Sequence, residues 1–126
     1  MTGKSSNALR ALVWVHVVLV IFTVIYALLG PRVAMDILGA VVWLVGGIAL
    51  LVGACWPGVP ASVRILTVLA ALCYAPAGGS HLYYAAFPPE VIGALINPLA
   101  LAGFLGPLFG LPAVAFAGLK QRPAAQ

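Results

Sequence analysis

Four long stretches of this chain contain no Lys, Arg, Asp or Glu: residues 11–30, 37–63, 65–89 and 91–119. An apolar helix of about 20 residues is long enough to cross the hydrocarbon core of a bilayer, which is about 30 Å thick. The sequence therefore predicts an all-α integral membrane protein that forms a single domain over residues 1–126. We expect four transmembrane helices, at residues 11–30, 34–55, 62–86 and 91–119.

The composition leaves little material for a water-soluble domain, because 64% of the residues are hydrophobic and 6% are charged. A net charge of +4 would suggest nucleic-acid binding in a soluble protein. Here the basic residues flank apolar spans, where they mark topology. The two cysteines, Cys55 and Cys73, have no C-x-x-C spacing. We therefore expect no nucleic-acid binding and no redox pair.

The distribution of Lys and Arg predicts the orientation, since cytoplasmic loops carry the excess of positive charge. With the N-terminus inside, only Arg32 lies on the outer side. The other basic residues are then cytoplasmic: Lys4, Arg10, Arg64, Lys120 and Arg122. We expect both termini in the cytoplasm. The short loops and the richness in Ala, Gly, Val, Leu and Pro suggest a bacterial inner (cell) membrane and a multi-pass protein.

Two of the predicted spans contain helix-breaking residues. Span three carries Pro76 followed closely by two glycines, and span four carries Pro98, Pro107 and Pro112. Proline removes a backbone hydrogen bond and bends or breaks a helix. We therefore expect a kink or break in span three and kinks in span four.

Small residues recur at the spacing of a helix-packing seam. In span two, glycines occur every seven residues; in span four, small residues step by three and four. The residues of the two seams are Gly39, Gly46, Ala49 and Gly53, and Gly103, Gly106, Gly110, Ala113 and Ala117. Helices in lipid associate by close backbone approach along such seams. One interpretation is packing within the chain, and the other is that one face receives a second subunit.

Intramembrane polar residues form two stripes of period seven. His16 and Thr23 share a face of span one, and Thr67, Tyr74 and His81 share a face of span three. An intramembrane histidine is a candidate functional residue. His16 has three interpretations: a neutral imidazole bonded to a carbonyl or hydroxyl on a neighbouring helix, a haem or metal ligand, or a proton-relay group.

His16 and His81 are the candidate cofactor-binding residues, and their spacing limits what they can bind. At 1.5 Å per residue they differ in depth by roughly 13 Å, whereas two histidines on one iron have nitrogens about 4 Å apart. Bis-histidine haem ligation within one chain is therefore disfavoured. A single histidine that ligates a cofactor shared with another subunit stays open.

A second candidate region lies near the outer surface. Asp36, Tyr84 and Asn97 are polar residues expected at that depth, and Asn97-Pro98 interrupts span four. Broken helices often line transporter binding sites. We interpret these three residues as a candidate binding region.

No Ser/His/Asp, HExxH or glycine-rich phosphate pattern is present, and no carboxylate lies at the middle of a span. We therefore expect no enzymatic activity and no metal site. The first hypothesis is an accessory or structural subunit of a larger membrane complex, of the respiratory or photosynthetic type, with other membrane subunits as partners. The alternatives are a small transporter or channel made of several copies of the chain, and a haem- or cofactor-binding subunit of a membrane enzyme.

Overall fold

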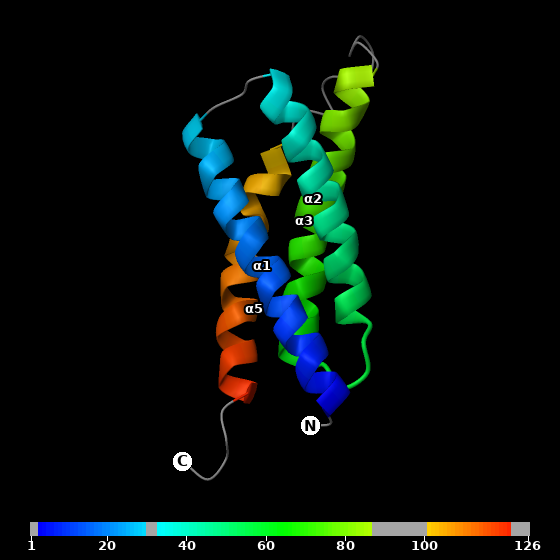
Figure 1. Cartoon of the computed structure of the whole chain (residues 1–126), viewed down its shortest axis with the longest axis vertical. Helices are drawn as coiled ribbons and strands as arrows, with labels where there is room; N and C mark the ends of the chain where they lie inside the picture. Colours follow the sequence, from blue (N-terminus) through cyan, green and yellow to red (C-terminus); the bar gives the residue numbers. More distant parts are fainter. Residues whose placement is uncertain (1–2, 30–32, 87–100, 122–126) are drawn as a thin grey trace.

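The computed structural model describes residues 3–29, 33–86 and 101–121, and these residues are all helical apart from the turn between the second and third helices. Four α-helices run up and down in a bundle (Figure 1). They are α1 (Gly3–Leu29), α2 (Val33–Ala54), α3 (Ala61–Ala86) and α5 (Gly106–Gln121), the last preceded by a 3-10 turn, η1 (Gly103–Leu105).

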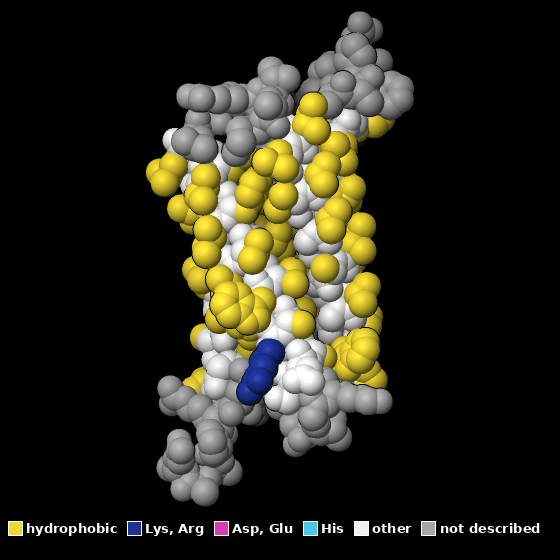
Figure 2. Space-filling view, viewed as in Figure 1, with side chains coloured by type: hydrophobic (Ala, Val, Ile, Leu, Met, Phe, Trp, Pro, Cys, Tyr) yellow, Lys and Arg dark blue, Asp and Glu magenta, His cyan; other side chains and the backbone are white. Residues whose placement is uncertain are grey.

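Among the described residues, three helices are long and apolar enough to cross a membrane, over Ser6–Leu28, Ile37–Ala54 and Ala61–Tyr83. A shorter apolar helix covers Gly103–Leu119. The chain is therefore a multi-pass membrane protein, as predicted. Figure 2 shows hydrophobic side chains along the visible face, with a basic side chain at the end where α1 begins. The first part of predicted span four, up to residue 100, lies outside the described residues.

The start of α1 and the end of α5 lie at the same end of the bundle (Figure 1). This arrangement agrees with an even number of crossings. The turn between α2 and α3 lies at that end too, so Arg10 and Arg64 are both placed there, as the charge distribution predicts.

Helices α1 and α2 pack by inserting large side chains over the glycines of α2. A Cβ added to Gly46 would lie 2.5 Å from Leu19, and one added to Gly53 would lie 2.6 Å from Leu12. Tyr26 occupies the same position over Gly39. The three partners on α1 are also spaced by seven residues, so the two helices are antiparallel and keep one register along their length.

Helices α2 and α3 approach each other more closely, with backbone against backbone. A Cβ on Gly78 would lie 2.5 Å from the amide nitrogen of Leu44 and 2.6 Å from the carbonyl oxygen of Ala40. A Cβ on Gly47 would lie 2.8 Å from the backbone nitrogen of Ala75. This second seam of α2 was not predicted, because Gly47 lies outside the seven-residue repeat of Gly39, Gly46 and Gly53.

The break expected in span three is wrong, since α3 is one continuous helix from Ala61 through Pro76 to Ala86. Pro76 removes a single backbone hydrogen bond, and the close packing of Gly78 on α2 holds the segment that follows it. The Ser80 hydroxyl donates to the carbonyl of Ala77 at 2.8 Å.

In span four, α5 also runs unbroken through Pro112. The chain before Pro107 winds more tightly, as a 3-10 turn over Gly103–Leu105. Pro98 lies outside the described residues. Kinks in α3 and α5 therefore stay a prediction, whereas the 3-10 turn is observed.

The turn after α2 is fastened by an arginine of the next helix. Arg64 donates from Nε to the carbonyl of Ala54 at 2.8 Å and from Nη2 to the carbonyl of Trp56 at 3.2 Å. Gly58 adopts a φ of 88°, which disfavours a side chain there. A positive charge at a helix C-terminus also offsets the negative end of the helix dipole.

Candidate functional site: a polar cluster inside the bundle

Four polar side chains in the middle of the bundle face its interior. His16, Thr23, Thr67 and Tyr74 are all buried, with exposed fractions of 3% or less. A bilayer core offers no water to a polar group, so such side chains turn towards one another or towards backbone carbonyls. The two stripes predicted on spans one and three therefore meet inside the molecule.

His16 of α1 is hydrogen-bonded to α3. Its Nε2 lies 2.9 Å from the Thr67 hydroxyl oxygen. This is the first of the three interpretations given for His16, an imidazole bonded to a hydroxyl on a neighbouring helix. The bond ties the middle of α1 to the first half of α3.

A second hydrogen-bonded group lies seven residues further along α1. The indole Nε1 of Trp43, on α2, donates to the Thr23 hydroxyl at 3.0 Å, and that hydroxyl donates to the carbonyl of Leu19 at 2.6 Å. Trp43 was not singled out from the sequence. The feature that could have identified Trp43 was its position in the middle of a span, where tryptophan is less common than at the membrane interface.

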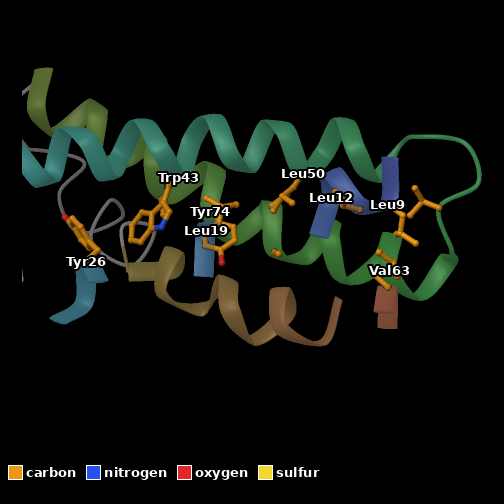
Figure 3. Close-up of a cluster of buried hydrophobic side chains, with 13 residues drawn as sticks. Leu9, Leu12, Leu19, Tyr26, Trp43, Leu50, Val63 and Tyr74 are labelled. Atoms are coloured by element: carbon orange, nitrogen blue, oxygen red, sulfur yellow. The ribbon is translucent and has the colours of Figure 1, made fainter. Parts of the chain in front are cut away.

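Two buried polar atoms between these groups have no hydrogen-bond partner: Nδ1 of His16 and the hydroxyl of Tyr74. Both lie near Gly110 of α5. A Cβ at that glycine would be 3.2 Å from Nδ1 and 3.8 Å from the tyrosine oxygen. The Tyr74 hydroxyl also approaches Thr23, without the geometry of a hydrogen bond. Figure 3 shows the Tyr74 ring directed towards α5.

The glycine seam of η1 and α5 is filled by rings from the other three helices. Gly103 of η1 contacts the indole of Trp43, Gly106 contacts the ring of Tyr74, and Gly110 faces the imidazole of His16. Ala113 and Ala117 continue the seam and are each 1% exposed. Packing within the chain therefore involves all three glycines of this seam and, on α2, Gly39, Gly46 and Gly53. A second subunit on these faces stays a prediction.

The close approach of α5 bears on the cofactor hypothesis for His16. One imidazole nitrogen is bonded to Thr67, and the backbone of Gly110 lies directly beside the other. A planar cofactor on Nδ1 would require α5 to move away from α1. In this arrangement the geometry favours a small hydrogen-bonding group.

His81, the other candidate, lies near the opposite end of the bundle. Its ring centroid is 6.4 Å from that of Tyr26 and 5.7 Å from that of Trp43. Tyr26 is ten residues beyond His16 on α1, which corresponds to about 15 Å. The structure does not bring His16 and His81 together, as expected from their predicted depths. Nε2 of His81 is buried and has no hydrogen-bond partner.

The candidate region at the outer surface is not covered by the structure. Asp36 belongs to α2 and Tyr84 to α3, but their side chains are not described. Asn97 lies outside the described residues. Elsewhere in the described part of the chain, no group of three or more His, Cys, Asp or Glu residues is arranged to hold a metal ion.

A groove between α1 and α2 opens on the exterior of the helix bundle. Trp14, Val15 and Val18 line it on one side, and Val45 and Ala49 line it on the other. This part of the groove has a volume of about 460 Å³. A second part shares Val15 and Ala49 with it and runs towards the end of the bundle where α1 begins, ending near Asn7 and Trp56. The groove was not predicted from the sequence, because it depends on how far the two helices separate.

Comparison with known proteins adds no family to this description. No protein-family model matches the chain. No curated protein and no solved structure matches it either. The polar cluster and the groove between α1 and α2 are therefore the features that bear on function.

Proposed function

We propose that this protein is a small accessory subunit of a larger membrane protein complex, and that the groove between α1 and α2 binds a transmembrane helix of a partner subunit. The proposal places it in a bacterial inner membrane with both termini in the cytoplasm. Its main support is the groove, an exposed apolar depression that the chain's own helices leave open.

The chemistry of the groove suits an apolar helix. Its sides carry exposed valines, with Val18 at 55% and Val45 at 59%, and small residues such as Ala49 lie between them. Polar side chains are absent from its described lining between Trp14 and Ala49. A segment bound there must satisfy its own backbone hydrogen bonds, which a helix does. Small residues let a second helix approach closely.

The length of the groove also fits a helix. On α1 it extends from Asn7 to Leu19, which is about 18 Å, or just over three helical turns. A contact of this length lies along most of one leaflet. An exposed tryptophan, Trp14, borders it, and large exposed aromatics are frequent in protein interfaces.

The alternative of a transporter or channel made of several copies is less well supported by the packing. That hypothesis has the copies pool their polar groups, whereas His16, Thr67 and Tyr74 are buried within a single chain. The exposed side chains of residues 11–28 and 37–54 are all apolar or aromatic.

The groove is tested by replacing Val45 with a photo-crosslinking amino acid and irradiating cells that express the full-length protein. We expect a crosslink to another membrane protein, which native mass spectrometry after mild detergent extraction should also recover as a bound subunit. The same amino acid at Leu108, exposed on α5, should give no such product.

A blocking substitution provides the matched control. Ala49→Phe fills the groove and should abolish recovery of the partner, whereas Ala115→Phe, at an exposed position on α5, should not. A crosslink from Val45 only to a second copy of the chain would favour the transporter or channel hypothesis. Equal recovery of the partner by both phenylalanine variants would contradict the proposed binding site.

A further inference from the structure

We propose that the bundle interior binds one water molecule between Nδ1 of His16 and the hydroxyl of Tyr74, beside Gly110. This water would link α1 to α3 a second time, beside the hydrogen bond between His16 and Thr67. The inference concerns the interior of the protein and is independent of the function proposed for the groove.

The two atoms converge on one place. His16 is 1% exposed and Tyr74 is fully buried, and neither atom has a hydrogen-bond partner. Each lies within 4 Å of the point where a Cβ of residue 110 would stand. Since residue 110 is glycine, no Cβ crowds the two polar atoms; one would lie 3.2 Å from Nδ1.

A water molecule suits this space better than an apolar filling. A buried polar atom without a partner is costly, and more so where lipid surrounds the protein. Buried waters bind where at least two polar groups converge. Nδ1 and the tyrosine hydroxyl supply these two groups.

The donors and acceptors of the cluster define the direction of each hydrogen bond. The Thr67 hydroxyl is bonded to Nε2 of His16, so we assign it as the donor, which leaves the imidazole proton on Nδ1. Nδ1 then donates to the water, and the water donates to the Tyr74 oxygen.

The test uses the full-length protein in lipid bilayers with ¹⁵N-labelled histidine. The chain has two histidines, so His81→Gln leaves His16 as the single labelled ring. If that variant does not fold, the two rings of the unsubstituted protein are distinguished by which one responds to Tyr74→Phe. Water-edited solid-state NMR then reports transfer from water protons to the His16 ring, and the ¹⁵N shifts report which nitrogen carries the proton.

We expect a water contact at the His16 ring and a protonated Nδ1. Gly110→Ala should abolish the contact, because its Cβ would lie 3.2 Å from Nδ1. Gly118→Ala, on the same helix and with nothing within 4 Å of its Cβ, should leave it unchanged. Tyr74→Phe should also abolish the contact and shift the Nδ1 resonance.

Three results would overturn the proposal. One is a folded protein with no water contact at His16. Another is a contact that persists in Gly110→Ala. The third is a shift of the His16 nitrogen in Tyr74→Phe without any water signal, which would mean that the two side chains bond directly in a dry core.

Discussion

At the scale of single residues, the main feature is that the polar side chains pair across helices. His16 and Thr23 on α1 have the same spacing as Thr67 and Tyr74 on α3, so one polar face can meet the other. In lipid, apolar surface gives helices little preference for a particular partner face, whereas a buried hydrogen bond does. We therefore interpret the bond between His16 and Thr67 as a determinant of helix register.

The contribution of this bond can be measured with Thr67→Val. The change keeps the shape of the side chain and removes the hydroxyl, so Nε2 of His16 loses its partner. We expect the free energy of unfolding to fall by about 1 kcal/mol. Leaving a buried polar group unsatisfied costs about 1–3 kcal/mol in water-soluble proteins. Hydrogen bonds between helices of a membrane protein contribute about 0.6 kcal/mol on average. Unfolding by SDS in mixed micelles gives the value.

Thr67→Ser retains the hydroxyl and serves as the control, with a smaller loss expected. If valine and serine destabilise the protein equally, the hydroxyl contributes nothing beyond its methyl group, and the bond does not set the register.

The sequence could predict part of this cluster but not all of it. Period-seven spacing placed His16 with Thr23 on one face of span one, and Thr67 with Tyr74 on one face of span three, because all four lie in regular helices. It could not show that Gly110 stands beside Nδ1, since that contact depends on where α5 crosses the bundle. Trp43 was missed for the same reason, because its partner, Thr23, lies on another helix.

At the scale of helices, α2 uses two different faces for its two neighbours. One face carries glycines that receive large side chains from α1, such as Leu19 over Gly46. The other lies against the backbone of α3 at Gly47 and Gly78. The α1 to α2 spacing is therefore set by side chains, and the α2 to α3 spacing by backbone atoms.

Two adjacent glycines of α3 test this difference. Gly78→Ala places a Cβ 2.5 Å from a backbone nitrogen of α2, which cannot turn aside as a side chain can. The helices must separate, and we expect a loss of about 1–3 kcal/mol in the free energy of unfolding.

Gly79→Ala is the matched control, because its Cβ would meet nothing within 4 Å. Here the higher helix propensity of alanine should leave stability unchanged or raise it by up to about 1 kcal/mol. Equal destabilisation by both variants would indicate a general sensitivity of the segment after Pro76. A neutral Gly78→Ala would contradict the close packing of α2 on α3.

At the scale of the whole molecule, charge and hydropathy predicted the apolar spans. They could not predict how the helices are arranged. Helix α1 carries apolar side chains on every side, with exposed Ile21 and Leu28 as well as buried Leu12 and Leu19. Lipid and protein interior are both apolar, so composition does not separate the two faces. The groove and the neighbours of α5 therefore required the structure.

The proposed orientation is tested with a natural cysteine. Cys55 is exposed in the turn after α2, at the end of the bundle where α1 begins (Figure 1). In a Cys73→Ala background, a membrane-impermeant maleimide should label Cys55 in inverted membrane vesicles and leave it unlabelled in intact spheroplasts. We expect Cys55 on the cytoplasmic side because Lys and Arg are in excess at that end.

A second cysteine provides the control for this experiment. In a protein without native cysteines, Asn7→Cys, also at an exposed position at that end, should show the same pattern of labelling. Labelling of both sites in intact spheroplasts would reverse the orientation and place the termini outside.

The position of α5 has a consequence for biosynthesis. The glycines of α5 and of the preceding turn η1 cover Trp43, Tyr74 and His16, which lie on three helices that leave the ribosome earlier. Until α5 arrives, the nascent chain holds an imidazole and a phenol against lipid or against the insertion machinery. We therefore expect a chain truncated before Gly103 to be a target of membrane proteases even though its earlier spans insert.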